Sequence, residues 1–301
     1  MRDQPELLGF FFDALRFFRL VDRFGEHSLF DLSACIGRTG SRARTPPTVA
    51  CVRNVIPAPF LTPRLAAAHS VTLFSATLKP WRFYGDTLGL PADTAFVDVA
   101  SPFGGGQLSV RIARHISTRY RDRAASLPGI VQLMAQQWHE RPGNYLAFFS
   151  SHEYLGQVAQ AFAERHGEIP QWRQSPRMEE GEQARFIERF VPGGRGIGFA
   201  VLGGSFSEGI DLPGDRLIGA FIATLGLPQV NAVNEQFKQR IGKMLGQGEA
   251  YTYLYPGLQK VVQAAGRVIR TPSDQGVVHL MDDRFHRAEV RRLLPDWWVV
   301  P

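Results

Sequence analysis

The stretch Gln263-Ala264-Ala265-Gly266-Arg267-Val268-Ile269-Arg270 decides how the rest of the chain is interpreted. On a helical turn its two arginines share one face, so both guanidinium groups can point at a single target. A guanidinium is planar and permanently charged, and it fits phosphate oxygens better than any other side chain. Gly266 has no side chain, so another group can come close beside Arg267. The stretch therefore predicts a site for a phosphate-bearing ligand.

A second stretch, Ser207-Glu208-Gly209-Ile210-Asp211, lies upstream and follows an apolar run at residues 197–202. Its two acids accept hydrogen bonds, so they suit a ribose hydroxyl or a water held by Mg²⁺ and repel phosphate itself. Gly209 lets a ligand approach the backbone, and the hydroxyls of Ser205 and Ser207 can donate to nucleic-acid phosphates. The alternative is an ordinary turn between strand and helix with solvated acids.

Two further hydroxyl-bearing stretches also follow apolar runs. Ser150 and Ser151 come after residues 144–149, and ligands usually meet a parallel sheet where its strands end. These hydroxyls can hold a nucleic-acid phosphate without reading bases, or Ser151 can simply cap the next helix. Ser75 and Thr77 come after residues 71–74 and can equally be a plain strand end with a hydroxyl cap.

The ordered set of stretches resembles the second motor domain of superfamily 2 helicases, in the XPD/DinG branch. Gln-x-x-Gly-Arg-x-x-Arg is similar to motif VI, and Ser-Glu-Gly-Ile-Asp is similar to motif V. Phe148-Phe149-Ser150-Ser151 is similar to motif IV, and Ser75-Ala76-Thr77 is similar to motif III. The same family places related stretches at Ser101-Pro102-Phe103, Tyr255-Pro256-Gly257 and Asp282-Asp283-Arg284-Phe285.

The resemblance implies ATP hydrolysis coupled to translocation along single-stranded DNA and to unwinding, in the service of DNA repair. It makes Arg270 the arginine finger, Arg267 a second phosphate contact and Gln263 the group that positions them or the water. The remaining implied residues are ATP-binding Gly266, Glu208, Gly209 and Asp211, DNA-binding Ser150, Ser151, Ser205 and Ser207, and coupling Ser75 and Thr77. The alternative is a catalytically silent nucleic-acid-binding or regulatory module derived from such a helicase.

Apolar runs and amphipathic stretches alternate after residue 101. Strands are predicted at residues 144–149, 198–202, 217–224 and 276–281, and helices at 153–166, 180–191, 230–245, 258–268 and 284–294. Buried strands that alternate with crossover helices favour an α/β fold with a mostly parallel sheet flanked by helices. By resemblance, residues 101–301 are a RecA-like motor lobe 2.

Residues 1–100 are expected to be a partial first lobe that precedes it. Apolar positions at helical spacing predict a helix at residues 5–24, short strands are predicted at 49–52 and 71–74, and a helix at 80–88. By resemblance this region is the C-terminal remnant of motor lobe 1, with motif III and the helix that returns from the family's arch domain.

The chain lacks a Gly-x-x-x-x-Gly-Lys-[Ser/Thr] loop and an Asp-Glu-Ala-His stretch, the Walker A and Walker B elements. ATP and Mg²⁺ would therefore need a missing N-terminal motor half, and we expect this chain to be inactive as an enzyme on its own. An iron–sulfur cluster needs four thiolates, whereas the chain has two cysteines, so no cluster and no metal site are expected in it. The expected partners are single-stranded DNA or DNA junctions.

Composition agrees with a polyanion partner. The chain has 301 residues, 44% of them hydrophobic, and a net charge of +6. Between Asp31 and Asp86 there is no acid, and this segment instead carries Arg38, Arg42, Arg44, Arg53, Arg64, Lys79 and Arg82. These residues can form a phosphate-attracting patch or a solvated loop. No apolar stretch is long enough for a membrane, and few cysteines favour a cytoplasmic setting.

Overall fold

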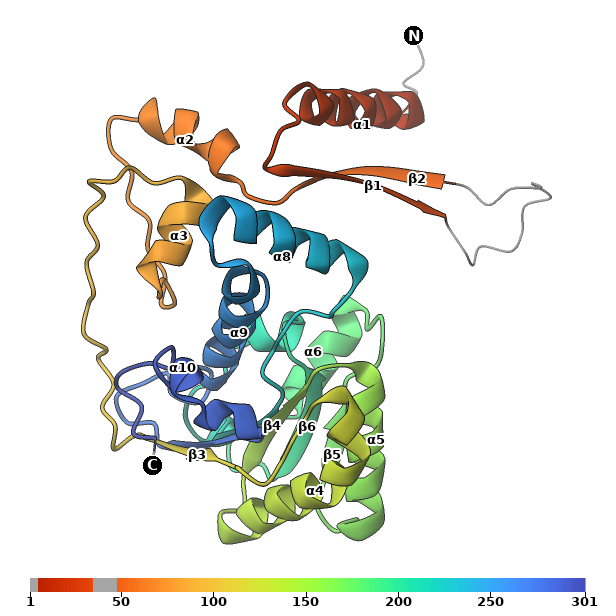
Figure 1. Ribbon diagram of the computed structural model, residues 1–301. Coiled ribbons are helices and arrows are strands. Elements are labelled where there is room, and N and C mark those ends of the chain that lie inside the picture. Colours follow the sequence, from red (N-terminus) through yellow and green to blue (C-terminus); the bar gives the residue numbers. More distant parts are fainter. Residues whose placement is uncertain (1–4, 35–47, 301) are drawn as a thin grey trace, which may run out of the picture. The chain divides into compact units, whose positions relative to one another are not determined.

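The computed structural model describes residues 5–34 and 48–300. The side chains of Pro5, Ser207 and Glu208 lie outside the described part, as do the predicted basic residues between positions 35 and 47. The chain divides into two compact units, Met1–Phe96 with Pro228–Tyr253, and Val97–Leu227 with Leu254–Pro301 (Figure 1). Residues 228–253, which the sequence analysis placed in the second domain, thus group with the first unit.

The second unit is built on a six-stranded, all-parallel sheet in the order β3-β8-β7-β4-β6-β5. Its strands are β3 (Leu108–Ile112), β4 (Asn144–Phe149), β5 (Gln171–Arg173), β6 (Gly196–Val201), β7 (Gly219–Ala223) and β8 (Gly276–Leu280). Every residue of β4, β7 and β8 is buried. Strands of this kind are covered by helices on both faces. The predicted α/β fold with a mostly parallel sheet is confirmed.

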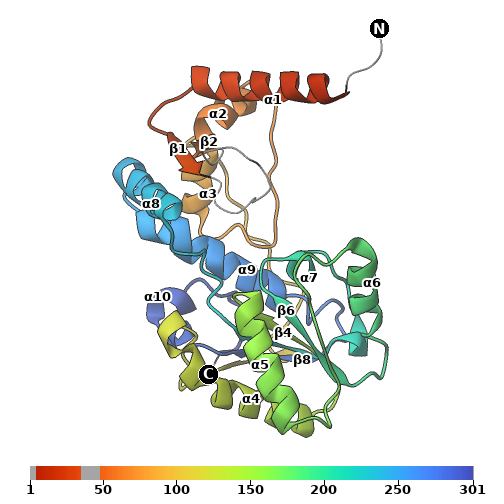
Figure 2. The same ribbon diagram turned by 90° about the vertical axis from the view of Figure 1, so that its right-hand side faces the viewer.

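Helices form a layer on each face of this sheet, as the two views show (Figures 1 and 2). One layer holds α4 (Arg123–Glu140) and α5 (His152–Arg165), and the other holds α6 (Glu180–Glu188), α7 (Ser205–Glu208), α9 (Tyr255–Ala265) and α10 (Ala288–Arg291). Alternate residues of β4 serve the two layers: Tyr145, Ala147 and Phe149 pack towards α4 and α5, whereas Leu146 and Phe148 pack towards the other helices.

The parallel register brings the ends of the strands together. Phe149, the last residue of β4, lies opposite Ala223 in β7 and Val201 in β6, the last residues of those strands. Leu280, which ends β8, lies opposite Ile222 in β7. The segments that follow these strands therefore emerge along one side, called the carboxyl edge below. This edge is where polar side chains can gather without entering the core.

The first unit contains α1 (Pro5–Asp22), α2 (Ala58–Ala66), α3 (Trp81–Leu88) and α8 (Ala232–Leu245), with a hairpin of β1 (Ser28–Ala34) and β2 (Thr48–Asn54). An Asp31–Arg53 ion pair spans the hairpin. The segment 228–253 joins this unit through polar contacts: the Tyr251 hydroxyl donates to Asp86 at 2.6 Å, and Arg240 donates to the Glu26 carbonyl at 3.2 Å. In the described part of the chain, no helix combines the length and apolar character needed to cross a membrane.

Two predicted elements were wrong, and one helix was not predicted. Residues 71–74 form no strand, because a strand needs a hydrogen-bonded neighbour and the hairpin pairs only with itself among the described residues. Residues 284–294 form a 3₁₀ turn and the short α10 instead of one helix. Helix α4 was not predicted at all, since Pro128 lies inside it and proline normally disrupts a helix interior.

A buried network of side-chain hydrogen bonds links β8 to α4, on the face of the sheet that α4 covers. His279 of β8 is stacked on Phe221, and its Nε2 lies 2.7 Å from Oε1 of Gln137 in α4. The Gln137 amide in turn lies 3.5 Å from the Tyr145 hydroxyl. Burial, with a smaller contribution from Arg111, lowers the pKa of His279 from 6.5 to about 4. The imidazole is therefore neutral in the folded protein near pH 7.

This lowered pKa predicts acid sensitivity. An unfolded chain protonates the histidine near pH 6.5 and the folded chain only near pH 4, so stability is present above pH 6.5 and is lost as the pH falls to 4. Between pH 6.5 and pH 4 this histidine lowers the free energy of unfolding of the parent protein by about 3 kcal/mol. We expect His279→Gln to lack this decrease, as measured by urea titration across that pH range. The exposed His286→Gln is the control. Identical pH profiles for His279→Gln and the parent protein would refute the prediction.

Candidate functional site

The arginines of the 263–270 stretch lie just beyond a helix. Helix α9 ends at Ala265, and tight turns follow in which the Arg267 and Val268 amides donate to Ala264 and Ala265. Val268 and Ile269 are drawn into the core, and the Asp274 carboxylate accepts from the Arg270 amide at 2.7 Å. The predicted helical turn is therefore wrong in detail, although the three-residue spacing still brings both guanidinium groups to one target.

That target is a single backbone carbonyl in the upstream stretch. Arg267 Nη1 donates to the Ile210 oxygen at 3.0 Å, and Arg270 Nη2 donates to the same oxygen at 3.1 Å. Arg270 Nε also lies 3.2 Å from Oδ1 of Asp211, outside hydrogen-bonding geometry. Two stretches that lie 57 to 60 residues apart in sequence thus form one cluster, called the arginine pair below.

The other predicted ligand-binding residues differ in their solvent exposure and in their position relative to the helices. Asp211 is 77% exposed, whereas Arg270 is 29% exposed, so the carboxylate can exchange partners more readily than the guanidinium. Gly209 directly follows α7, which begins at Ser205, and Gly266 directly follows α9. Gln263 is half-buried on the last turn of α9. The side chains of Glu208 and Ser207 lie outside the described residues, so their predicted roles stay predictions.

The arginine pair lies away from the carboxyl edge. Helix α9 begins beside the end of β7, where a side chain on Gly257 would come within 2.9 Å of the Leu225 oxygen. It ends at the opposite side of the sheet, where Val268 packs on Gly276, the first residue of β8. The backbone of both arginines thus lies near the side of the sheet where β8 begins, because α9 runs back along the sheet before they occur.

The predicted serines of motif IV do lie at the carboxyl edge. Ser151 caps α5 by accepting from the Tyr154 amide at 3.2 Å. Ser150 is exposed, and its hydroxyl accepts from Arg123 Nη2 at 2.8 Å. The Arg123 guanidinium also lies over the rings of Tyr120 and Tyr154, at 5.2 and 4.9 Å from their centres. Burial raises the pKa of Tyr154 to about 12, so the phenol stays neutral.

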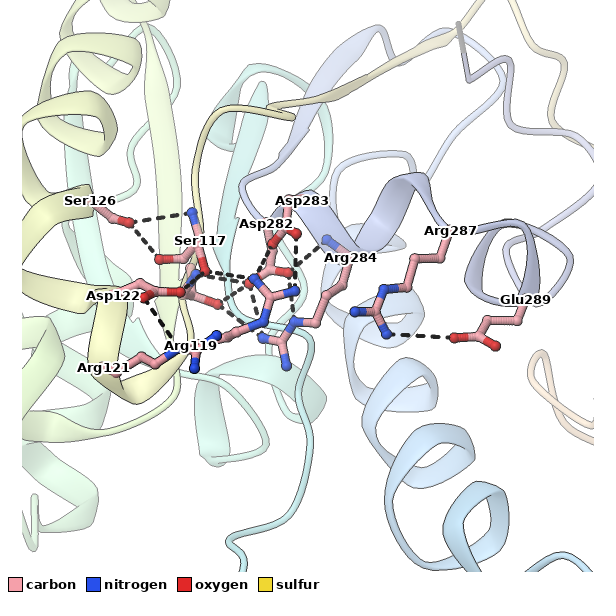
Figure 3. Close-up of polar contacts among 11 residues, drawn as sticks. Ser117, Arg119, Arg121, Asp122, Ser126, Asp282, Asp283, Arg284, Arg287 and Glu289 are labelled. Carbon is pink, nitrogen blue, oxygen red and sulfur yellow. Dashed lines mark hydrogen bonds and ion pairs between the residues drawn. The ribbon is translucent and has the colours of Figure 1, made fainter.

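A polar network holds the segment that carries Tyr120 in place, and Figure 3 shows its members. The buried Asp282 accepts from the Thr118 amide and hydroxyl and from Arg284 Nε at 2.7 Å. Burial alone would raise the pKa of Asp282, but the hydrogen bonds of Arg284 and Thr118 outweigh it and hold the pKa below its ordinary value. Asp283 forms a two-point ion pair with Arg119, at 2.6 and 3.0 Å. The loop is thereby fixed to the end of β8.

Two neighbouring side chains of this loop are exposed to solvent. Tyr120 is 80% exposed, and the Arg121 side chain is 83% exposed. The Tyr120 ring has Arg123 over it, and Arg121 Nε lies 3.5 Å from Oδ1 of Asp122. An exposed aromatic ring and an exposed guanidinium on adjacent residues offer stacking and phosphate contacts together. Arg119, Tyr120, Arg121, Arg123 and Ser150 are called the carboxyl-edge cluster below. Its first four members were not predicted from the sequence, although residues 119–123 alternate arginine with other residues, one of them a tyrosine.

The residues predicted for coupling lie in the first unit. The Ser75 and Thr77 hydroxyls are 3.3 Å apart, and the Thr77 amide donates to Ser75 at 3.2 Å. The Thr77 carbonyl accepts from the Tyr84 hydroxyl at 2.6 Å. These contacts define a local hydroxyl-bearing turn, held to α3. They do not test the predicted coupling role.

The donor set of the second unit fits part of a nucleotide site. Two guanidinium groups suit phosphate oxygens, and an exposed carboxylate beside them suits a hydroxyl or a metal-bound water. A cation such as Mg²⁺ needs several oxygen ligands, and near the arginine pair the described side chains offer it Asp211. The arrangement can thus form part of a nucleotide site.

Comparisons with known proteins identify the family. A family model described as the helicase C-terminal domain matches residues 134–300, more than half of the chain. The XPD helicase subunit of general transcription and DNA repair factor IIH from Arabidopsis thaliana is 27% identical over 209 residues, covering 60% of this chain and 26% of that protein. The ATP-dependent helicase DinG of Mycobacterium tuberculosis is 26% identical over 254 residues, covering 80% of this chain and 37% of DinG.

Solved structures share the fold. A structure of XPD helicase aligns with a TM-score of 0.65 at 19% identity, covering 83% of this chain and 45% of that one. A structure of apo XPD aligns with a TM-score of 0.67 at 19% identity, covering 85% and 53%. The chain therefore spans well under two thirds of these relatives. From the matched family model, the relatives and the shared fold, we conclude that the chain belongs to the helicase C-terminal domain family and is of the XPD/DinG type.

Proposed function

We propose that the chain is the C-terminal part of an ATP-dependent DNA helicase that translocates along single-stranded DNA and unwinds duplexes. The observation that carries this proposal is the convergence of Arg267 and Arg270 on the Ile210 carbonyl beside Asp211. Relatives named as an ATP-dependent helicase and as a helicase subunit of a DNA repair factor support it. DNA repair is accordingly the proposed setting.

Arg270 acts as the arginine finger in this proposal. During hydrolysis, negative charge shifts over the phosphoryl oxygens and the leaving oxygen, and a guanidinium placed there stabilises the transition state more than the ground state. The Ile210 carbonyl orients both guanidinium groups beforehand, so little rearrangement is needed when charge develops. Arg267 supplies a second phosphate contact, and Gln263 positions the arginines or the attacking water.

ATP with Mg²⁺, when bound, supplies the phosphoryl group and neutralises part of its charge. On this chain Gly209 and Gly266 have no side chains and would let the nucleotide come close to the protein backbone. Glu208 and Asp211 would accept hydrogen bonds from a ribose hydroxyl or a metal-bound water. Most of the triphosphate would be held by an N-terminal motor half. The greater length of the relatives supports such a half.

Helix α1 provides a second argument for a further partner domain. Several of its large apolar side chains are more than half exposed, among them Leu7, Phe10 and Phe18. Apolar surface of this density is costly in water and usually lies against another protein segment. We propose that α1 packs on the N-terminal motor half, and that Ser75 and Thr77 couple DNA contact to hydrolysis there.

DNA is proposed to run across the carboxyl edge of the sheet. The exposed Tyr120 ring can stack on a base, and the neighbouring Arg121 and Ser150 can contact the backbone on either side. Ser151, at the start of α5, and Ser205, at the start of α7, lie at helix N-termini, which attract phosphate. Contacts of these types tolerate any sequence and weaken with salt.

A catalytically silent nucleic-acid-binding module is the second candidate, and the carboxyl-edge cluster favours it equally, because DNA contact needs no hydrolysis. The two candidates differ in ATP turnover. We expect the full-length gene product to hydrolyse ATP and to be stimulated by single-stranded DNA. DNA binding without any turnover would select the silent module.

Substitution of the proposed finger is the first test. We expect Arg270→Ala in the full-length gene product to lower ATP turnover by about 10³- to 10⁵-fold, with little change in ATP affinity. Arg270→Lys keeps the charge but cannot hold two acceptors with one planar fork, so it should be almost as impaired. Arg195→Ala, an exposed arginine before β6, is the matched control. Unchanged turnover in Arg270→Ala would remove the finger assignment.

Substitutions in the carboxyl-edge cluster are the second test. Tyr120→Ala should weaken binding of single-stranded DNA by about 5- to 150-fold, the loss of one stacked base, while Tyr120→Phe keeps the ring and most of the affinity. Arg121→Ala should lower the slope of log affinity against log salt by about 0.7. Both are measured by fluorescence anisotropy with a labelled oligonucleotide. Arg165→Ala, exposed at the far end of α5, should match the parent protein, and equal loss there would refute a localised DNA site.

A further inference from the structure

Three potential metal ligands meet where α4 and α5 end. His139 is the penultimate residue of α4, His166 directly follows α5, and Glu168 lies in the loop that leads to β5. Their nearest ligand atoms all lie within 4.8 Å of one another. Both helices begin at the carboxyl edge and run back from it, so this trio is one full helix length from the carboxyl-edge cluster.

The spacing of these atoms is close to that of a tetrahedral metal site. His139 Nε2 lies 3.4 Å from Glu168 Oε1, and His166 Nδ1 lies 3.5 Å from the same oxygen. With zinc–ligand bonds of about 2.0–2.1 Å, neighbouring ligand atoms of a tetrahedron are about 3.3 Å apart. Two of the three ligand-to-ligand distances therefore already match, and a small rotation of an exposed side chain can close the third.

The scaffold fixes one ligand and leaves the others adjustable. The His166 amide donates to Phe162 at 2.8 Å, and its ring packs 5.5 Å from the Phe162 ring. Its side chain is 20% exposed, compared with 54% for His139 and 56% for Glu168. A partly buried ligand with two mobile ones allows an ion to enter from solvent and then draw the site together.

From this geometry we propose that His139, His166 and Glu168 bind one divalent transition-metal ion, with Zn²⁺ as the preferred ion. Two imidazoles and one carboxylate form a donor set that zinc uses in proteins, with the fourth position open to water. The ion would join the ends of α4 and α5, which cover one face of the sheet, and so stabilise that layer. No metal site was expected from the sequence, because only the two cysteines were considered as ligands. His139 and His166 lie on different helices, and the fold brings them together.

The test is titration of the tag-free, chelator-treated chain with ZnCl₂ at pH 7.5 by isothermal calorimetry. We expect one site with a dissociation constant on the order of 1 μM. At a free Zn²⁺ concentration near 100 times that constant, thermal unfolding should shift upwards, as binding to the folded state requires. A titration without a stoichiometric site would overturn the proposal.

Variants assign the site. His139→Ala and His166→Ala should each weaken Zn²⁺ binding at least tenfold, and Glu168→Gln, which preserves the size of the side chain, should do the same. His286→Ala and the double variant Cys35→Ser/Cys51→Ser should bind like the parent chain. Co²⁺ substitution should give a tetrahedral visible spectrum without a thiolate charge-transfer band. Retained binding in the His139→Ala/His166→Ala double variant, or lost binding in the cysteine variant, would disprove these ligands.

Discussion

A parallel sheet buried on both faces is the constraint on which the second unit depends. Its strands satisfy their backbone hydrogen bonds by pairing, and both faces are filled by side chains that pack against helices. Polar chemistry is therefore confined to the ends of the strands and to the turns that enter or leave them. The carboxyl-edge cluster and the arginine pair occupy opposite ends of this sheet. In the proposed function, contact with DNA and contact with nucleotide would therefore be separated along the length of the strands.

The sequence predicted elements best where apolar character alone determines burial. Strand β4 was predicted to the residue, because six consecutive buried residues lie between Gly143 and Ser150. Strand β3 was missed, although Leu108, Val110 and Ile112 alternate with Ser109 and Arg111 in the pattern of a half-buried strand. Residues 71–74 have strand-like composition, yet composition cannot supply a partner strand. Local apolar character was thus enough for β4, whereas the absence of a partner strand decided the outcome at residues 71–74.

The same distinction applies to the candidate site. The three-residue spacing of Arg267 and Arg270 correctly predicted a shared target, because local spacing determines which side chains can converge. It could not predict that the target is the Ile210 carbonyl, which lies 57 and 60 residues away. Nor could it predict that Asp282 and Asp283 would fix the loop containing Tyr120, across separations of 164 residues. The residue types thus indicated which ligand the arginines suit, whereas contacts between distant parts of the chain determine where these side chains lie.

The assignment of residues 228–253 to the first unit has a consequence for protein engineering. The backbone passes between the two units three times, after residues 96, 227 and 253. A recombinant fragment that simply starts near residue 97 would retain residues 228–253 while removing Glu26 and Asp86, to which Arg240 and Tyr251 are hydrogen-bonded. Such a fragment would expose the α8 surface and favour aggregation. An expression design for the sheet unit alone should replace residues 228–253 with a short glycine-serine linker between β7 and α9.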